Sequence, residues 1–295
     1  MNSGYSRVDV RGVVGFVLIA YLPAWLMTLP LWLSGRGLSW EWAPALLVGM
    51  MFVPAVATFV VTRWISPARS TPRETGLTDP GGIRKWWPHA LLAWFGPPLA
   101  AILALLVSYA FTLYDWTGFP VRDVLVDVVL LGWLGILPAL GQEWGWRGYL
   151  VRALLPLGQP AAFLVSGVLW GLWYSPLLVL GYNYPTVPVV ASFIMMICYC
   201  TLVGTLLGWL RLATRSVWPA VIAQTFLGAA AGLPAMLNGA GQPVSHVTEG
   251  LLSWPGWIVL GVLVLVLVGI RQLPVVFPSE HSTGISKGVR RLSRP

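Results

Sequence analysis

The chain has 295 residues, of which 57% are hydrophobic and only 9% charged, and its formal net charge is +8. Soluble domains carry about 25% charged residues, so this composition excludes a protein that faces water on all sides. We therefore expect an all-α, polytopic membrane protein with the lipid bilayer as its surroundings.

Apolar stretches of about 20 residues are long enough to cross a bilayer core of roughly 30 Å. The sequence predicts about eight transmembrane helices, near residues 13–34, 43–62, 87–113, 124–142, 160–181, 187–210, 216–234 and 254–270. The third and seventh are rich in proline and are the candidates for a broken or re-entrant path. The segment 63–86 is expected to be a true connector, because arginine, proline and paired glycines interrupt any apolar run.

The basic residues indicate the orientation. Lys and Arg gather in the cytoplasmic loops of membrane proteins. With eight spans, all 18 basic residues except Arg36 and Arg122 fall on the side of the N-terminus. We therefore expect both termini to be cytoplasmic. The positive charge is then a topology signal, and we expect no nucleic-acid partner, since no basic face carries interleaved aromatics.

The expected organisation is a short cytoplasmic N-terminus (1–12), an integral membrane domain (13–270) and a basic cytoplasmic tail (271–295). The first apolar run is longer than a signal peptide's and lacks a small-residue cleavage site, which predicts an uncleaved first span. This fits a multi-pass protein of a bacterial inner (plasma) membrane, and the excess of arginine over lysine points to the same source. The tail has two interpretations, contact with anionic headgroups or a disordered segment that only fixes topology.

Two smaller patterns lie within the spans. Cys198 and Cys200 match no disulfide framework or metal site, so we expect buried free thiols. The glycine pairs 204/208 and 228/232 have the small-xxx-small spacing that lets helices approach closely. We expect them to pack within the molecule rather than to form a dimer face.

The chemistry is expected where the fourth span meets the cytoplasmic surface. Ionisable residues within a span are costly and need a partner or a polar cavity. Glu143 and Arg147 are spaced i, i+4 and can pair on one helix face. Taken alone, this pair is as well explained by an ion pair that holds the end of the span.

Three segments around this pair resemble the motifs of the CPBP family, the CAAX-protease and bacteriocin-processing membrane endopeptidases. The family's first motif is two adjacent glutamates, three residues and an arginine, often in a Gly-Trp-Arg-Gly-Tyr-Leu context. Its second is an aromatic, three residues and a histidine, and its third is a Ser-x-Trp-Pro-Ala run before a helix with histidine and, four residues on, asparagine. The similar segments here are 141–150 (GQEWGWRGYL), 170–176 (WGLWYSP) and 216–224 (SVWPAVIAQ). Order and spacing agree over a CPBP-like core of about residues 125–232.

The sequence departs from the family at the reactive groups. The resemblance implies that the first glutamate activates the attacking water and that the histidines and asparagine bind around the scissile carbonyl. Those positions hold Gln142, Tyr174, Gln224 and Gly228 here, whereas Glu143, Arg147 and the scaffold residues are kept. A glutamine has no titratable group, and a tyrosine with a reference pKa near 10 is a poor base.

No metal or other cofactor is expected. A catalytic zinc takes about three protein ligands, and the motif positions supply one, Glu143. His246 and His281 fall on opposite sides of the predicted membrane, so they cannot share a site. His89 starts the third span and can approach Glu143, although an ordinary interfacial histidine is the simpler interpretation. Asp127 is about four helical turns from Glu143 and too far to act as a second carboxylate.

These features leave three hypotheses. The first is a CPBP-type protein that has lost peptidase activity and binds a peptide or membrane-protein partner in a cytoplasm-facing cavity lined by Gln142, Glu143, Tyr174 and Gln224. The second is an active intramembrane endopeptidase that uses Glu143 as the base. The third is a transporter-like protein, which the scarcity of charge near the middle of the spans disfavours.

Overall fold

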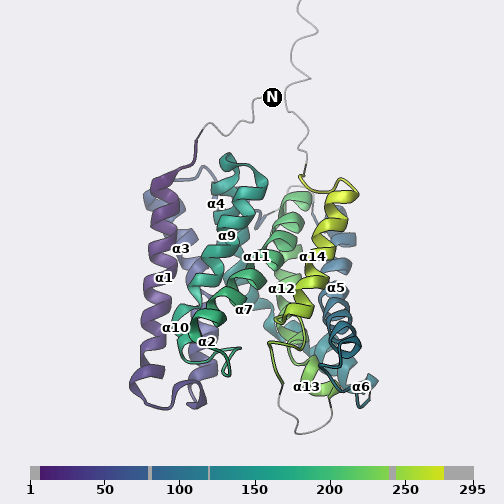
Figure 1. The fold of residues 1–295 in the computed structure, drawn as a ribbon. Helices are drawn as coiled ribbons and strands as arrows, with labels where there is room; N and C mark the ends of the chain where they lie inside the picture. The colour runs from purple at the N-terminus through teal and green to yellow at the C-terminus, as the bar shows by residue number, and fades with distance from the viewer. Residues whose placement is uncertain (1–6, 79–81, 119, 239–243, 276–295) are drawn as a thin grey trace, which may run out of the picture.

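The computed structural model describes residues 7–78, 82–118, 120–238 and 244–275, and the described chain is folded into helices joined by short loops (Figure 1). This confirms the predicted all-α class. The first six residues and the tail after residue 275, with His281, lie outside the described residues. The helical elements are α1 (Val10–Leu33), η1 (Gly37–Ser39), α2 (Ala43–Met51), α3 (Val53–Val60), η2 (Val61–Ile65), α4 (Thr71–Glu74), α5 (Ile83–Ala110), α6 (Val121–Asp123), η3 (Val124–Leu130), η4 (Leu131–Gly135), α7 (Ile136–Glu143), η5 (Trp144–Leu150), α8 (Val151–Leu154), η6 (Leu155–Leu157), α9 (Gln159–Trp173), α10 (Ser175–Val179), α11 (Val189–Thr214), α12 (Trp218–Ala230), α13 (Leu233–Leu237) and α14 (Trp254–Gly269).

Five helical stretches in the described part of the chain are long and apolar enough to cross a membrane. They are Val10–Leu33, Ala43–Ile65, Trp86–Ala110, Val121–Leu157 and Val189–Thr214, and α14 is a shorter apolar helix. The other two predicted spans correspond to α9 with α10 and to α12 with α13, which are shorter pieces. The count of eight therefore stays a prediction.

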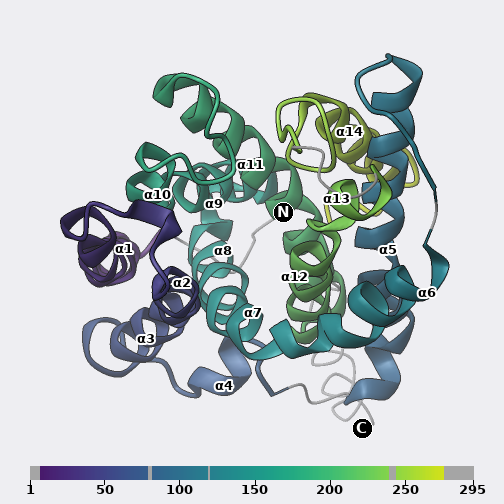
Figure 2. The ribbon, with the colours of Figure 1, turned by 90° about the horizontal axis from the view of Figure 1, so that it is seen from below.

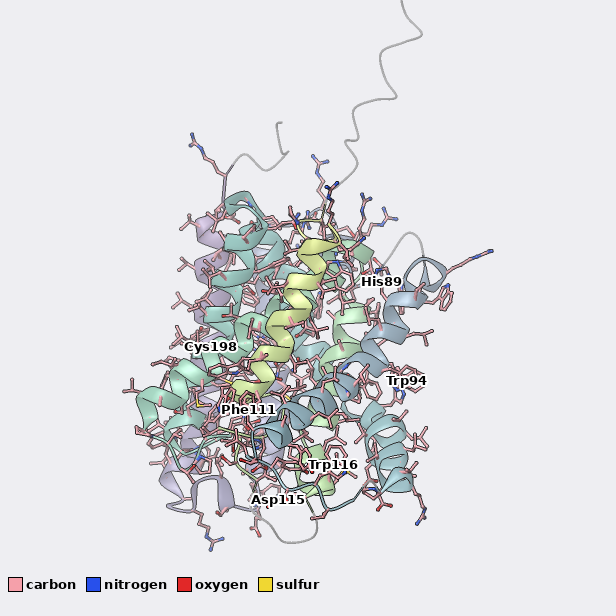
Figure 3. All side chains as sticks on the ribbon, turned by 45° about the vertical axis from the view of Figure 1, so that its right-hand side comes forward. His89, Trp94, Phe111, Asp115, Trp116 and Cys198 are labelled. Carbon is pink, nitrogen blue, oxygen red and sulfur yellow. The ribbon has the colours of Figure 1, made fainter. Side chains whose placement is uncertain are left out.

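The two ends of the bundle differ in their side chains. Figure 3 shows side chains that end in nitrogen gathered at the end where His89 lies, whereas Asp115 and Trp116 lie toward the opposite end. α1 begins and α14 ends at the same end of the bundle (Figure 1), as an even number of crossings requires. Which side of the membrane that end faces stays a prediction.

The two proline-rich spans behave differently. α5 runs without a break from Ile83 to Ala110 although Pro88, Pro97 and Pro98 lie inside it, so the expected break in the third span is wrong. Packing of α12 and α14 along α5 holds the helix together across these prolines. In the seventh span the expected interruption is confirmed, because α12 ends at Ala230 and α13 begins only at Leu233.

Large aliphatic side chains face outward and small residues face the interior. On α1, Leu18, Leu22 and Leu26 are each more than half exposed, whereas Ala20 and Ala24 are fully buried. A soluble helix would show the opposite arrangement, whereas lipid tails tolerate exposed leucine and small residues allow close helix contacts. Figure 2 shows α1 at the periphery of the bundle. The pattern fits a multi-pass membrane protein.

α9 and α11 cross where small residues meet. A Cβ atom added at Gly167 would lie 2.5 Å from Thr201 Cα, and one added at Gly208 would lie 2.5 Å from the Phe163 ring. Gly204 lies 3.7 Å from Gly167 by the same measure. The predicted packing of the 204/208 pair within the molecule is thus confirmed.

The 228/232 pair does not pack as predicted. A Cβ atom added at Gly228 would meet open space, and one added at Gly232 would meet only the carbonyl of Ala229, at 3.8 Å. Gly228 is exposed, and α12 ends at Ala230, before Gly232.

Candidate functional site

The segment that carries Gln142 and Glu143 is wedged against the junction of α2 and α3. A Cβ atom at Gly141 would lie 2.7 Å from the carbonyl oxygen of Met51, and one at Gly145 would lie 2.4 Å from Pro54 Cβ. Only glycine permits this approach at either position. α7 ends at Glu143 and continues as the π-helical segment η5, a rare geometry that is often found at functional sites.

Glu143 and Arg147 form the predicted ion pair in the interior. Arg147 Nη1 donates to Glu143 Oε1 over 2.7 Å, and the two side chains are 0% and 1% exposed. The guanidinium also lies over the Trp170 ring, 4.1 Å from its centroid. Gly204 provides the space for it, since a Cβ atom there would lie 3.3 Å from Arg147 Nη2. The arginine is therefore held by a carboxylate, an aromatic face and a glycine notch.

The pair is not fully satisfied. Glu143 Oε2 and Arg147 Nε are buried and have no hydrogen-bond partner among the described residues. Buried polar atoms normally have hydrogen-bond partners, so two unpaired atoms within one ion pair are unusual. The carboxylate thus keeps one acceptor oxygen that the arginine does not use.

Gln142 uses both ends of its amide. Trp170 Nε1 donates to Gln142 Oε1 over 3.2 Å, and Gln142 Nε2 donates to the Tyr174 hydroxyl over a long 3.5 Å. Gln142 is 2% exposed. Tyr174 in turn stacks on Tyr182, with ring centroids 5.9 Å apart and planes 9° apart. The amide is fixed between two aromatic side chains and carries no charge.

The structure therefore brings Gln142, Glu143, Arg147 and Tyr174 into one connected cluster around Trp170. Gln224 comes from α12, which packs against α7. Its Oε1 is buried and has no hydrogen-bond partner among the described residues. A direct contact of Gln224 with the cluster stays a prediction, and so does the enclosing cavity.

His89, Asp127 and the two cysteines lie outside this cluster. The His89 ring packs on Trp209 of α11, with centroids 5.7 Å apart, as an interfacial histidine would. Asp127 is exposed. Cys198 and Cys200 are free thiols, of which Cys200 is buried. Within the described residues no three His, Cys, Asp or Glu side chains are placed to hold a metal ion.

The segment 63–86 connects two candidate spans, as predicted, and within it α4 and the residues after it also bind the site helices. Trp144 Nε1 of η5 donates to Thr75 Oγ1 over 2.8 Å, and Arg152 of α8 pairs with Glu74 at 2.9 Å. We call Thr71–Leu77 the clasp.

The clasp also binds the start of α12. The backbone N–H of Val217 donates to the Gly76 carbonyl over 2.9 Å, and Trp218 Nε1 donates to the Leu77 carbonyl over 3.0 Å. Gly76 has a φ of +74°, and a Cβ atom there would lie 2.6 Å from the Arg211 guanidinium. The left-handed conformation favours glycine, and a side chain at this position would also displace the Arg211 guanidinium. The clasp thus joins the helix of Glu143 to the helix of Gln224, and no local sequence pattern indicates these contacts.

Residues 123–230 match the family model described as type II CAAX prenyl endopeptidase Rce1-like. A search of curated proteins found no match. The matched range nearly coincides with the core that the three motifs delimit.

Proposed function

The chain carries an Rce1-like domain of the CPBP family over residues 123–230, and on this premise we propose that it binds a peptide or membrane-protein partner without cleaving it. Its setting would be a bacterial inner membrane, with one membrane domain over residues 13–270. The partner would enter a cytoplasm-facing cavity lined by Gln142, Glu143, Tyr174 and Gln224.

The proposal rests on one observation, namely that the residue at position 142 is a buried, uncharged glutamine. At the position of the family's water-activating glutamate, a neutral amide is buried and held by Trp170 and Tyr174. General-base catalysis needs a group that takes a proton near neutral pH, and an amide does not. The neighbouring Glu143 is paired with Arg147, so its charge is already used in holding the helix.

A cleavage assay tests the loss of activity. The purified protein, in detergent and in liposomes, is incubated with prenylated and unprenylated peptides, and products are followed by mass spectrometry. We expect binding of a labelled peptide but no product. Turnover that is abolished in Glu143→Ala and kept in the exposed control Glu41→Ala would overturn the proposal.

A reverted protein shows how deep the loss is. It combines Gln142→Glu, Tyr174→His, Gln224→His and Gly228→Asn. The open space at Gly228 accepts the new side chain without a clash. If peptidase activity arises only in the reverted protein, the site is retained and lacks only its reactive groups. If the reverted protein folds but stays inactive, residues outside the three motifs also contribute to the loss of activity.

A second candidate function is an active endopeptidase that uses Glu143 as the base. The observation that favours it is the unpaired second oxygen of the Glu143 carboxylate in the described part of the chain. Glu143 Oε2 has no hydrogen-bond partner among the described residues and keeps a lone pair for a water molecule. Tyr174 and Gln224 would then donate hydrogen bonds to the developing oxyanion. This mechanism predicts a rate that follows one carboxyl group with pH and does not respond to chelators. A cellular cleavage product that persists in Glu143→Gln rules it out.

A further inference from the structure

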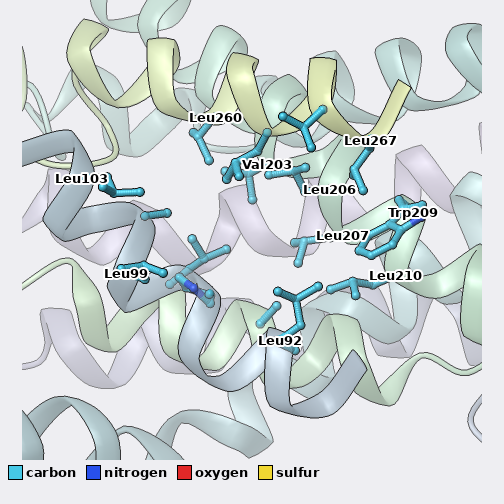
Figure 4. Close-up of a pocket in the computed structure, with 18 residues that line it drawn as sticks. Leu92, Leu99, Leu103, Val203, Leu206, Leu207, Trp209, Leu210, Leu260 and Leu267 are labelled. Carbon is cyan, nitrogen blue, oxygen red and sulfur yellow. The ribbon is translucent and has the colours of Figure 1, made fainter. Parts of the chain in front are cut away.

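An apolar groove lies between α5, α11, α12 and α14, apart from the Glu143 cluster (Figure 4). It has a volume of about 280 Å³, and all 18 residues that line it are of apolar type. Several of them, such as Leu99, Leu103 and Val266, are themselves 40–57% exposed. The groove is therefore open to the side, where the predicted bilayer lies.

The length of the groove matches one leaflet. On α5 the lining residues extend from Leu92 to Leu103, and on α14 from Leu260 to Leu267. At 1.5 Å per residue the α5 wall is about 16 Å long, roughly half of a 30 Å hydrocarbon core. A groove of this length accommodates a single acyl chain from one leaflet.

One end of the groove is lined by Trp209, whose ring nitrogen is unpaired within the described chain. Figure 4 shows the Trp209 indole at that end, and the ring is only 7% exposed. Its Nε1 is buried without a hydrogen-bond partner among the described residues, and so is Nδ1 of His89, whose ring packs on it. Indole N–H is a donor only, so a group that binds to Trp209 here has to supply a hydrogen-bond acceptor.

The same end is positively charged. Arg84 lies five residues before His89 at the start of α5, and Arg215 lies six residues after Trp209 just beyond α11, and both are exposed. Basic residues at a membrane surface attract anionic headgroups. Leu210 and Trp209 of the groove are thus followed along the chain by Arg215, and Arg84 precedes the groove residues of α5.

We propose that this groove is a binding site for one anionic phospholipid from the leaflet on the His89 side. Its acyl chain lies between α5, α11 and α14, a phosphate or ester oxygen accepts the hydrogen bond of Trp209 Nε1, and Arg84 and Arg215 flank the headgroup. Lipid that merely surrounds the protein would exchange freely, whereas this lipid is retained.

The test is native mass spectrometry of the full-length protein in detergent, titrated with phosphatidylglycerol and, separately, with phosphatidylcholine. Three variants separate the parts of the site. Gly96→Leu fills the groove, because its new Cβ would meet only Leu92 Cδ1, at 3.7 Å. Trp209→Phe keeps the ring and removes the donor. Gly261→Leu is the matched control, since it adds the same side chain in open space outside the groove.

We expect one retained phosphatidylglycerol in the wild type and in Gly261→Leu, with weaker retention of phosphatidylcholine. Retention should fall about tenfold in Trp209→Phe, the effect of one hydrogen bond to a charged group, and at least as much in Gly96→Leu. Helicity and size-exclusion profiles check each fold, and Leu99→Trp replaces Gly96→Leu if the latter fails to fold. Any of three results overturns the proposal. They are equal lipid retention in the wild type and Gly96→Leu, unchanged retention in Trp209→Phe, and no preference for phosphatidylglycerol over phosphatidylcholine. The proposal is also overturned if the wild type is a dimer and Gly96→Leu is a monomer, because the groove then binds a second copy of the chain.

Discussion

Removal of one partner from the Glu143–Arg147 pair should be among the most damaging single changes in the membrane domain. Both side chains are almost completely buried, and the two charged atoms lie 2.7 Å apart. At an effective dielectric constant of about 20, charges at that distance attract each other by about 6 kcal/mol. Removing a charge from water costs several kcal/mol per ion, so the intact pair contributes little net stability. A lone charge keeps the cost without the attraction.

Glu143→Met and Arg147→Met should therefore each lower the free energy of unfolding by about 3–5 kcal/mol. Arg147→Met also loses the contact with the Trp170 ring, which adds up to about 2 kcal/mol. The double variant removes both charges and should unfold within about 2 kcal/mol of the wild type. The two changes are thus strongly non-additive.

The assay is a denaturation curve in mixed micelles with increasing SDS, followed by circular dichroism, for the wild type, both single variants and the double variant. Arg152→Met is the control, because its pair with Glu74 has a similar distance, 2.9 Å, but is 36% and 31% exposed. Such a pair contributes at most about 1 kcal/mol. If Arg147→Met costs no more than Arg152→Met, or if the double variant loses the sum of the single losses, the reasoning is refuted.

Three further predictions concern packing, the clasp and pH. Gly145→Ala should cost about 1–3 kcal/mol because its Cβ has no room, whereas Gly228→Ala, in open space on α12, should be neutral or slightly stabilising, and the same SDS curves compare them. Trp144→Phe loses the 2.8 Å hydrogen bond to Thr75 and should speed hydrogen–deuterium exchange in the clasp, and an unchanged rate contradicts the clasp's role. Burial raises the pKa of Glu249, in the loop before α14, so its charged form is disfavoured in the folded state. Glu249→Gln should thus raise the melting temperature at pH 8, where the carboxyl is ionised, and leave it unchanged below pH 4, where both states are protonated.

Hydropathy and motif spacing were enough to predict the helical class, the ends of most long helices and the Glu143–Arg147 pair. These depend on local composition and on residues four apart on one helix. The predicted close packing at Gly228 and Gly232 is not found, because the spacing of two glycines does not reveal whether other atoms lie against them. The π-helical segment after Glu143 is not indicated by the sequence either, since the spacing of its residues is compatible with an ordinary α-helix.

The clasp and the groove could not be predicted from the sequence for a related reason. The partners of Thr75 and Leu77 are Trp144 and Trp218, which lie 69 and 141 residues away along the chain. A run of proline, arginine and glycine gives no sign of these contacts. Likewise, the groove exists only where four helices meet, and its lining combines exposed leucines such as Leu99 with buried ones such as Leu207 and Leu260.

The clasp also has a consequence for the order in which the protein is assembled. The ribosome makes residues 71–77 before their partners on η5, α8 and α12, and the last of these, Trp218, follows some 140 residues later. Chains emerge at about 5–20 residues per second, so the exposed carbonyls of Gly76 and Leu77 wait for on the order of ten seconds. Water at the membrane surface satisfies them during that time. The clasp can join the helices that carry Glu143 and Gln224 only after α12 has been inserted, so the site is completed late in biosynthesis.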